Sequence, residues 1–173
     1  MKAALAVLLF SLSVSAVAQS ADALYQQACG PKAAQFSVQL VKRQPPAAPE
    51  PGKALVYFIQ RENGPYFTTR IGLDGAWAGA VLHESYIVVS VAPGEHHACA
   101  ATLNRKRLEA ELMHFTAEAG KTYYFLVRGI AGGTGARDLD AMEIGPADRD
   151  EALALIASDP QSVAGPPVKK PIE

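Results

Sequence analysis

The sequence predicts an all-β fold: a single, mainly antiparallel β-sandwich of seven or eight strands, with an N-terminal arm and a short C-terminal helix. Short runs rich in β-branched and aromatic residues recur at a spacing of about ten residues. Turn signals such as Asn-Gly-Pro, Asp-Gly and Pro-Gly separate these runs. The length of 173 residues and the apolar content of 49% suit one domain with a buried core.

The strands of the sandwich are expected between residues 53 and 144. Residues 54–59 form a continuous apolar run, which is typical of a strand buried on both faces. Residues 108–117 contain good helix formers, but Glu109 and Glu111 alternate with apolar neighbours, so we assign a strand there. The other expected strands lie at 66–73, 77–82, 86–91, 95–103, 122–127 and 139–144.

Shorter elements are expected on both sides of the sandwich. A short helix is expected at 20–29 and a short strand at 35–41. Residues 44–52 contain four prolines, which exclude a helix and favour an extended linker. We therefore assign 19–52 to an N-terminal arm and Pro-rich linker, and 53–157 to the sandwich with its terminal helix at 147–156. The proline-containing tail at 158–173 is expected to be disordered.

The first residues have the three parts of a secretory signal. Lys2 supplies the positive charge, an apolar run spans 3–18, and Ala16-Val17-Ala18 precedes Gln19. The run is shorter than the about 20 residues that a membrane-spanning helix needs. We expect a signal peptide at 1–18, cleavage after Ala18, no membrane span, and a periplasmic or secreted protein.

The chain has two cysteines, Cys29 and Cys99, which permit a single intramolecular pairing. Export would place them where thiols are oxidised, so a disulfide is expected. It would close a loop of about 70 residues, worth about 4 kcal/mol in the chain-entropy model. The alternative, a reactive thiol, lacks the C-x-x-C pattern.

Charge and histidine patterns exclude several kinds of site. The formal net charge of −1 gives no reason to expect a nucleic-acid partner. His96 and His97 are sequential on an expected strand, so they point to opposite faces and do not share one ion. A site built from His83, Glu84 and His97 would need a convergence that the sequence does not show. We predict no metal and no cofactor.

No residue pattern predicts catalysis. The glycine-rich segment at 132–135 lacks the Gly-Lys-Ser/Thr that opens a phosphate-binding helix, and no Gly-x-Ser-x-Gly elbow is present. Glu109 and Glu111 are better explained as a solvated face than as a catalytic pair of carboxylates. The sequence therefore does not favour an enzyme.

Aromatic residues are the most suggestive surface feature. Adjacent aromatic residues in a strand place one ring on each face of the sheet, so about half of them need cover outside the core. Cover by the C-terminal helix is expected, with the N-terminal arm, a ligand or a partner as alternatives. The candidate binding surface for a partner consists of Tyr66, Phe67, Trp77, Tyr86 and Tyr124.

Four motifs resemble the DUF2846 family, a family of exported and lipoprotein β-domains of bacteria without an assigned function. They are Gly-Lys-Ala-Leu-Val-Tyr-Phe at 52–58, Ile-Gly-Leu-Asp-Gly at 71–75, Val-Ser-Val-Ala-Pro-Gly-Glu-His at 89–96 and Ala-Gly-Lys-Thr-Tyr-Tyr at 119–124. The turn motifs are also similar to PEGA-type surface modules. The resemblance implies no catalytic residue, and this chain lacks the acylated cysteine of the lipoprotein relatives.

These observations lead to one functional hypothesis and two alternatives. The leading hypothesis is an exported soluble β-sandwich module that binds a protein or a cell-envelope component through a sheet face or edge. The alternatives are a periplasmic enzyme with a His/carboxylate site and a carrier of a small apolar ligand. Convergent polar groups in a pocket would favour the enzyme, and an apolar cavity would favour the carrier.

Overall fold

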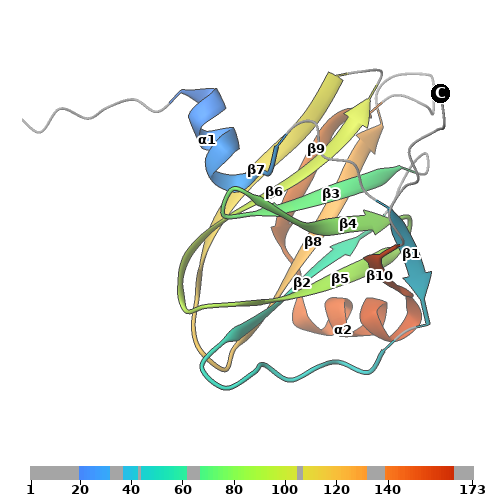
Figure 1. Ribbon diagram of the computed structural model, residues 1–173. Helices are drawn as coiled ribbons and strands as arrows, with labels where there is room; N and C mark the ends of the chain where they lie inside the picture. Colours follow the sequence, from blue (N-terminus) through green and yellow to red (C-terminus); the bar gives the residue numbers. More distant parts are fainter. Residues whose placement is uncertain are drawn as a thin grey trace, which may run out of the picture.

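Two β-sheets pack face to face, and the described chain has one short helix before its first strand and another before its last strand (Figure 1). The computed structural model describes residues 20–31, 37–42, 44–61, 67–104, 107–131 and 139–165, so the predicted signal peptide at 1–18 lies outside the described residues. The six-stranded sheet has the order β1-β10-β5-β2-β8-β9, and the four-stranded sheet has the order β4-β3-β6-β7. The elements are α1 (Ala21–Ala28), β1 (Val38–Val41), β2 (Ala54–Gln60), β3 (Thr68–Leu73), β4 (Ala76–Leu82), β5 (Ser85–Val91), β6 (Gly94–Asn104), β7 (Arg107–Ala117), β8 (Thr122–Ala131), β9 (Leu139–Pro146), α2 (Arg149–Ser158) and β10 (Gln161–Ala164).

The predicted β-sandwich is confirmed. Strands β2 to β9 fall on the segments where the sequence predicts strands, including the ambiguous segment at 108–117, which forms β7 and pairs with β6. Asp74 and Gly75 make the β3–β4 turn with φ angles of 52° and 79°. These are the left-handed conformations that favour Asp-Gly in a two-residue hairpin turn.

The core lies between the two sheets. From β2, Val56 and Phe58 point into it and are fully buried, and Phe58 contacts Phe125 of β8 with ring centroids 5.7 Å apart. The four-stranded sheet contributes Ile71 and Val81, which are also fully buried. Burial of these branched and aromatic side chains is the main favourable contribution to folding.

Strand β2 is central because the chain changes sheets around it. It pairs antiparallel with β5 and parallel with β8. After β2 the chain passes through β3 and β4 of the four-stranded sheet and returns at β5 on one side of β2. It then crosses again through β6 and β7 and returns at β8 on the other side of β2, which makes the parallel pair. β10 and β5 are also parallel, and the remaining described pairs are antiparallel.

Helix α2 covers the outer face of the six-stranded sheet (Figure 1). Leu55, Tyr57 and Ile59 pack there against a cluster that includes Leu155 and Ile156. Both faces of β2 are therefore covered, which explains why all seven of its residues are buried and why residues 54–59 form an uninterrupted apolar run.

The N-terminus of α2 is fixed by a side-chain cap. The predicted helix starts at 147, whereas the observed helix starts at Arg149, because Asp148 is the capping residue. Its Oδ1 accepts the N–H groups of Asp150 at 2.9 Å and Glu151 at 3.1 Å. A capping carboxylate satisfies helix N–H groups that have no partner within the helix.

Two short strands revise the expected domain boundaries. β1, in the expected arm, and β10, in the expected disordered tail, pair antiparallel and extend the six-stranded sheet. The prediction of disorder is wrong for Gln161–Ala164, because a four-residue run beside a proline carries little periodic signal and its partner strand lies at the other end of the chain. Residues 166–173 lie outside the described residues.

The Pro-rich segment lies against the outer tyrosines. Residues 44–50 have no helix or strand, as their prolines predict. The N–H of Ala47 donates to the Tyr57 hydroxyl at 2.9 Å, and the N–H of Gln44 donates to the Tyr86 hydroxyl at 3.3 Å. The linker therefore supplies hydrogen bonds to phenolic groups that would otherwise be buried without partners.

Candidate functional site

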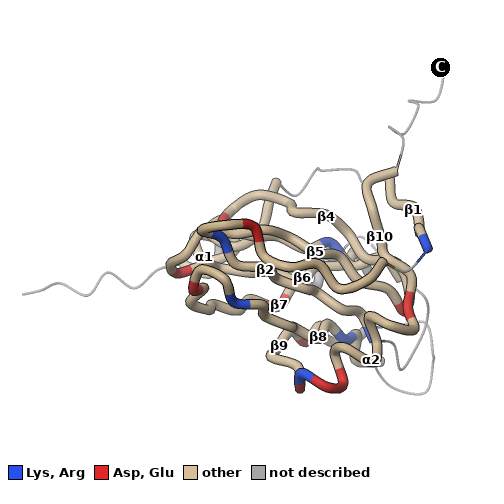
Figure 2. The backbone as a smooth tube through the Cα atoms, turned by 90° about the horizontal axis from the view of Figure 1, so that it is seen from below, with Lys and Arg blue, Asp and Glu red and all other residues tan. Residues whose placement is uncertain are grey.

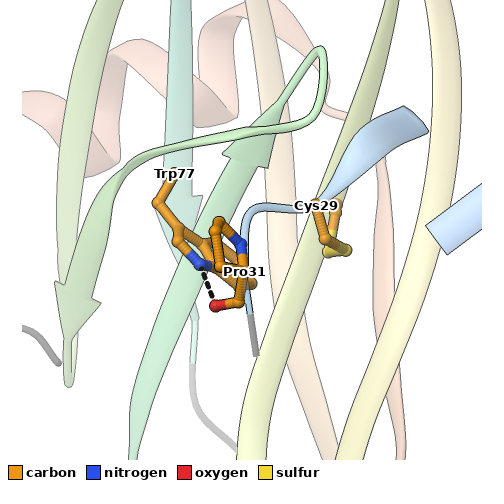
Figure 3. The surroundings of a disulfide bond; sticks show 4 residues. Cys29, Pro31 and Trp77 are labelled. Carbon is orange, nitrogen blue, oxygen red and sulfur yellow. Dashed lines mark hydrogen bonds between the residues drawn. A yellow bond between two sulfur atoms is a disulfide. The ribbon is translucent and has the colours of Figure 1, made fainter. Parts of the chain in front are cut away.

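The predicted disulfide joins Cys29 and Cys99, with 5.3 Å between their Cα atoms. Cys29 follows α1, and Cys99 lies within β6. Their exposures are 1% and 0%. The bond fastens the N-terminal segment to the four-stranded sheet (Figure 3) and leaves no free thiol in the chain.

The N-terminal segment lies in close contact with β3 and β4. A Cβ atom on Gly72 would be 2.7 Å from the Ala28 carbonyl oxygen, so this position has no room for a larger residue. The ring of Trp77 lies against Gly30, and its Nε1 donates to the Pro31 carbonyl oxygen at 2.8 Å (Figure 3). Trp77 thus anchors the segment that the disulfide fastens.

The five aromatic residues expected as a binding surface do not share one face. Tyr86 is 1% exposed, and Tyr124 packs with it in the cluster beneath α2. Phe67 packs against the core between the sheets, whereas Trp77 lies beside the disulfide. Tyr66 is outside the described residues. The described members of this set therefore do not form one exposed aromatic surface. The terminal helix and the linker cover the outer rings.

A groove of 380 Å³ lies at the edge where the two sheets separate, and this groove is the candidate binding site. Among the described members of the aromatic set, Trp77 alone borders it. Its other walls come from strands that the sequence analysis did not associate with one another. The lining consists of 77–80 from β4, Ile87 and Val88 from β5, Gln161–Ala164 of β10, and Ser37 with Val38 at the start of β1.

Serine hydroxyls close one end of the groove, where β4 turns into β5. The hydroxyl groups of Ser85 and Ser162 are 2.8 Å apart, and both residues are buried. The N–H of Leu82 donates to the Ser162 hydroxyl at 3.1 Å and to that of Ser85 at 3.2 Å. This cluster ties β10 to the corner of the sandwich and fixes the end of the groove.

The described groove lining carries no charged side chain. The strands β4, β10 and β1 contain no Lys, Arg, Asp or Glu (Figure 2). The side chains along the middle of the groove are small, since Ala78, Gly79 and Ala80 form the β4 wall. Small side chains leave the main chain of a strand accessible to a ligand.

A second hollow of 340 Å³ lies at β7, β8 and β9 and has a different chemistry. Its described lining includes Glu111, Arg128 and Glu143. Arg128 and Glu143 are paired positions on β8 and β9, and the Nε of Arg128 is buried without a hydrogen-bond partner among the described residues. The two carboxylates outnumber the one guanidinium, so the described lining of this hollow is charged and net acidic.

His96 and Asp74 form a His–carboxylate contact, which is the kind of pair that the enzyme alternative requires. His96 is 8% exposed, its Nδ1 lies 2.7 Å from Asp74 Oδ2, and its Nε2 lies 2.8 Å from the Ala92 carbonyl oxygen. Both neighbours are acceptors, so the ring satisfies both only when both nitrogens carry a proton. Burial lowers the pKa of His96, but the hydrogen bonds to Asp74 and Ala92 and the charge of Asp74 outweigh it and leave the pKa raised above 6.5.

This arrangement is structural rather than reactive. His97, the next residue, points to the other face of β6 as expected, and its Nε2 lies 2.9 Å from Gln27 Nε2. Asp74 Oδ1 also accepts the N–H of His97 at 2.9 Å, so the carboxylate holds the β3–β4 turn against β6. Because both His96 nitrogens are engaged, the ring has no free nitrogen for a substrate.

Stability should therefore fall as the pH rises past the pKa of His96. Between about pH 6.5 and the raised folded-state pKa, the native protein binds more protons than the unfolded chain, so the free energy of unfolding decreases with pH. We expect His96→Gln to lower that free energy by about 2 kcal/mol at pH 6 and to flatten its decline toward pH 8. Urea unfolding at several pH values measures both effects.

The exposed His114 provides the matched control for this prediction. His114→Gln should leave the decline with pH unchanged. A variant lacking His96 that kept the full decline would contradict the assignment.

No group of three or more His, Cys, Asp or Glu side chains in the described ranges is arranged to hold a metal ion. Within the same ranges, no helix has the length and apolar character needed to cross a membrane.

Comparison with known proteins places the sequence in a family. No curated protein and no solved structure matches the chain. A family model, DUF2846 (Protein of unknown function), matches residues 50–135, which include strands β2 to β8. The match agrees with the four motifs that suggested this family, and through residues 50–135 the chain belongs to DUF2846.

Proposed function

We propose that this protein is an exported, non-enzymatic module that binds a protein or a cell-envelope component in the groove between β4 and β10. The observation that carries the proposal is a groove of 380 Å³ bordered by β4 and β10, whose described lining carries no charged side chain. Pockets that bind a partner are concave and mainly apolar, with a few polar groups that fix orientation.

Two features support export. The apolar run at 3–18, followed by small residues, has the form of a cleavable signal. The disulfide between Cys29 and Cys99 is the kind of bond that persists in oxidising compartments. Intact-mass measurement of the exported protein should give a chain that begins at Gln19, and a chain that retains Met1 would contradict export with cleavage.

The chemistry of the groove supports binding rather than catalysis. The described lining has no Asp, Glu, His, Lys, Cys or Tyr side chain that could act as a general acid or base, and therefore none that could activate its serine hydroxyls. The contact between His96 and Asp74 lies outside that lining and engages both ring nitrogens. A binding role requires only the shape and the main-chain groups that the strands provide.

Site-specific photo-cross-linking in the cell envelope tests the binding role. A photoreactive residue replaces Val163 in the groove or, as the matched control, the exposed Ile130 of β8. We expect a discrete adduct from position 163 and none from position 130. Equal labelling from the two positions would contradict a specific site in the groove.

A variant that fills the groove makes this test sharper. A Cβ on Gly79 would meet Ile87 Cδ1 at 3.4 Å, an ordinary contact, so we expect Gly79→Ala to fold and to narrow the groove. The adduct from position 163 should fall about tenfold, as expected for loss of about 1.4 kcal/mol. Gly145→Ala is the control, because a Cβ at Gly145 meets nothing within 4 Å and lies outside the groove.

A further inference from the structure

We propose that the hollow at β7, β8 and β9 is a second binding site, which takes a free basic amino acid with the charged groups of lysine. The site is separate from the groove and does not depend on the binding role proposed there. Three charged side chains that have no partners of their own surround this hollow of 340 Å³.

Two opposite charges rise side by side from the outer face of the six-stranded sheet. Arg128 follows Leu126 by two residues on β8, so the two side chains point to the same face, and Leu126 belongs to the cluster beneath α2. Glu143 of β9 is the position paired with Arg128. Side chains at directly paired positions share a face, with Cβ atoms about 5 Å apart, so the guanidinium and the carboxylate reach the same space.

The guanidinium of Arg128 is available to a ligand. In the described part of the chain it forms no hydrogen bond and no ion pair, and its Nε is buried. The buried Nε shows that the side chain lies against the sheet instead of extending into water, so the direction of its head is restricted. Such a group suits a ligand carboxylate, because its two terminal nitrogens donate to both carboxylate oxygens.

A second carboxylate and an apolar floor complete the hollow. Glu111 of β7, a strand that lies beside β9, borders the same space, and this side chain is exposed. Leu126 and Pro146 supply apolar surface. A Cβ on Gly145 would meet nothing within 4 Å, so the floor is open between them. The volume is in the range of small-molecule sites.

The charges of the described lining define the complementary ligand. Two carboxylates and one guanidinium match two ammonium groups and one carboxylate, which are the charged groups of free lysine. The α-carboxylate pairs with Arg128, the α-ammonium with the adjacent Glu143, and the ε-ammonium with Glu111. The methylene chain lies over the apolar floor. A simple anion would meet two carboxylates, and a simple cation would leave the guanidinium unpaired.

NMR titration of the whole exported protein with lysine tests the site. We expect saturable shifts at the amides of Glu143 and Gly145 and at the Nε–H of Arg128. The amide of Val163, which borders the groove, serves as the internal reference and should not shift.

Three analogues each lack one charged group of lysine. Norleucine lacks the ε-ammonium, 6-aminohexanoate lacks the α-ammonium, and 1,5-diaminopentane lacks the carboxylate. Each should bind about fivefold more weakly than lysine, as expected for the loss of one partly exposed ion pair.

Matched variants connect each ligand group to its residue. Arg128→Gln should weaken lysine binding about fivefold without weakening 1,5-diaminopentane, which has no carboxylate to lose. Glu143→Gln should weaken lysine more than 6-aminohexanoate, which has no α-ammonium. Arg149→Gln is the control, because this exposed arginine of α2 lies outside the described lining, and it should bind lysine as the unchanged protein does.

The results test this site separately from the groove. If lysine caused no saturable shifts, or if lysine and its three analogues bound equally well, the proposal would be wrong. Equal lysine affinities of Arg128→Gln and the unchanged protein would also overturn it, since the carboxylate would then bind elsewhere. Cross-linking from position 163 reports on the groove alone, so the two proposals fail independently.

Discussion

Replacing both Cys29 and Cys99 by alanine is expected to lower the free energy of unfolding by about 4 kcal/mol. The disulfide joins two residues that are 70 positions apart in the sequence. Its loss therefore increases the conformational entropy of the unfolded chain. It also releases a segment that the structure packs against Gly72. Urea unfolding of the two proteins gives the difference.

Reduced wild-type protein is the control that keeps both sulfur atoms. It should lose nearly as much stability as the double variant, because the cross-link and not the side-chain volume accounts for most of the effect. Trp77 is the single tryptophan of the chain and packs in the cluster around the disulfide, so its fluorescence should shift to longer wavelength when the segment loosens. A loss below about 1 kcal/mol in both proteins would contradict this account.

The sequence predicts the strands of the sandwich well because their signals are local. The continuous apolar run of β2 reflects burial on both faces, and the Asp-Gly turn reflects the left-handed φ angles of Asp74 and Gly75. The disulfide is equally easy to predict from the sequence, since two cysteines permit one pairing. Each of these inferences needs a few neighbouring residues or simple counting.

Local sequence patterns do not reveal the groove, because it depends on contacts between strands that lie far apart in the sequence. It exists because β10 pairs with β5 at one position and then diverges from it, while β4 remains an edge strand. Pairing between β1 and β10 joins the two ends of the chain, so neither short strand has a strong signal of its own. The small residues Ala78, Gly79 and Ala80 were the available clue, because a run of small residues in a strand marks a place where another group approaches closely.

For the aromatic residues, the sequence predicts that the outer rings need cover but does not identify every segment that covers them. Adjacent rings such as Tyr57 and Phe58 were correctly assigned to opposite faces of a sheet, and the outer ring needs cover. The hydroxyl of Tyr57 accepts the N–H of Ala47, a contact with the Pro-rich segment that composition alone does not reveal. A sequence shows that a ring must be covered, but the covering element follows from the tertiary structure.

Phe58→Ala is expected to lower the free energy of unfolding by about 4 kcal/mol. Phe58 is 0% exposed and contacts Phe125, so truncation leaves a cavity between the two sheets. A tightly packed interior collapses little around such a cavity, and the loss includes both the transfer of the ring and the contacts that remain unfilled. Thermal and urea unfolding measure the change.

The exposed Ile130 gives the comparison for this prediction. It is 39% exposed on β8, so Ile130→Ala should cost less than about 1 kcal/mol. Phe58 is absent from the described lining of the groove, so the cavity should lower stability without abolishing the cross-linked adduct from position 163 in the folded fraction. If Phe58→Ala cost no more than Ile130→Ala, the two sheets would not share the packed core described above. A folded Phe58→Ala protein that no longer gave the adduct from position 163 would show that the core and the groove are coupled.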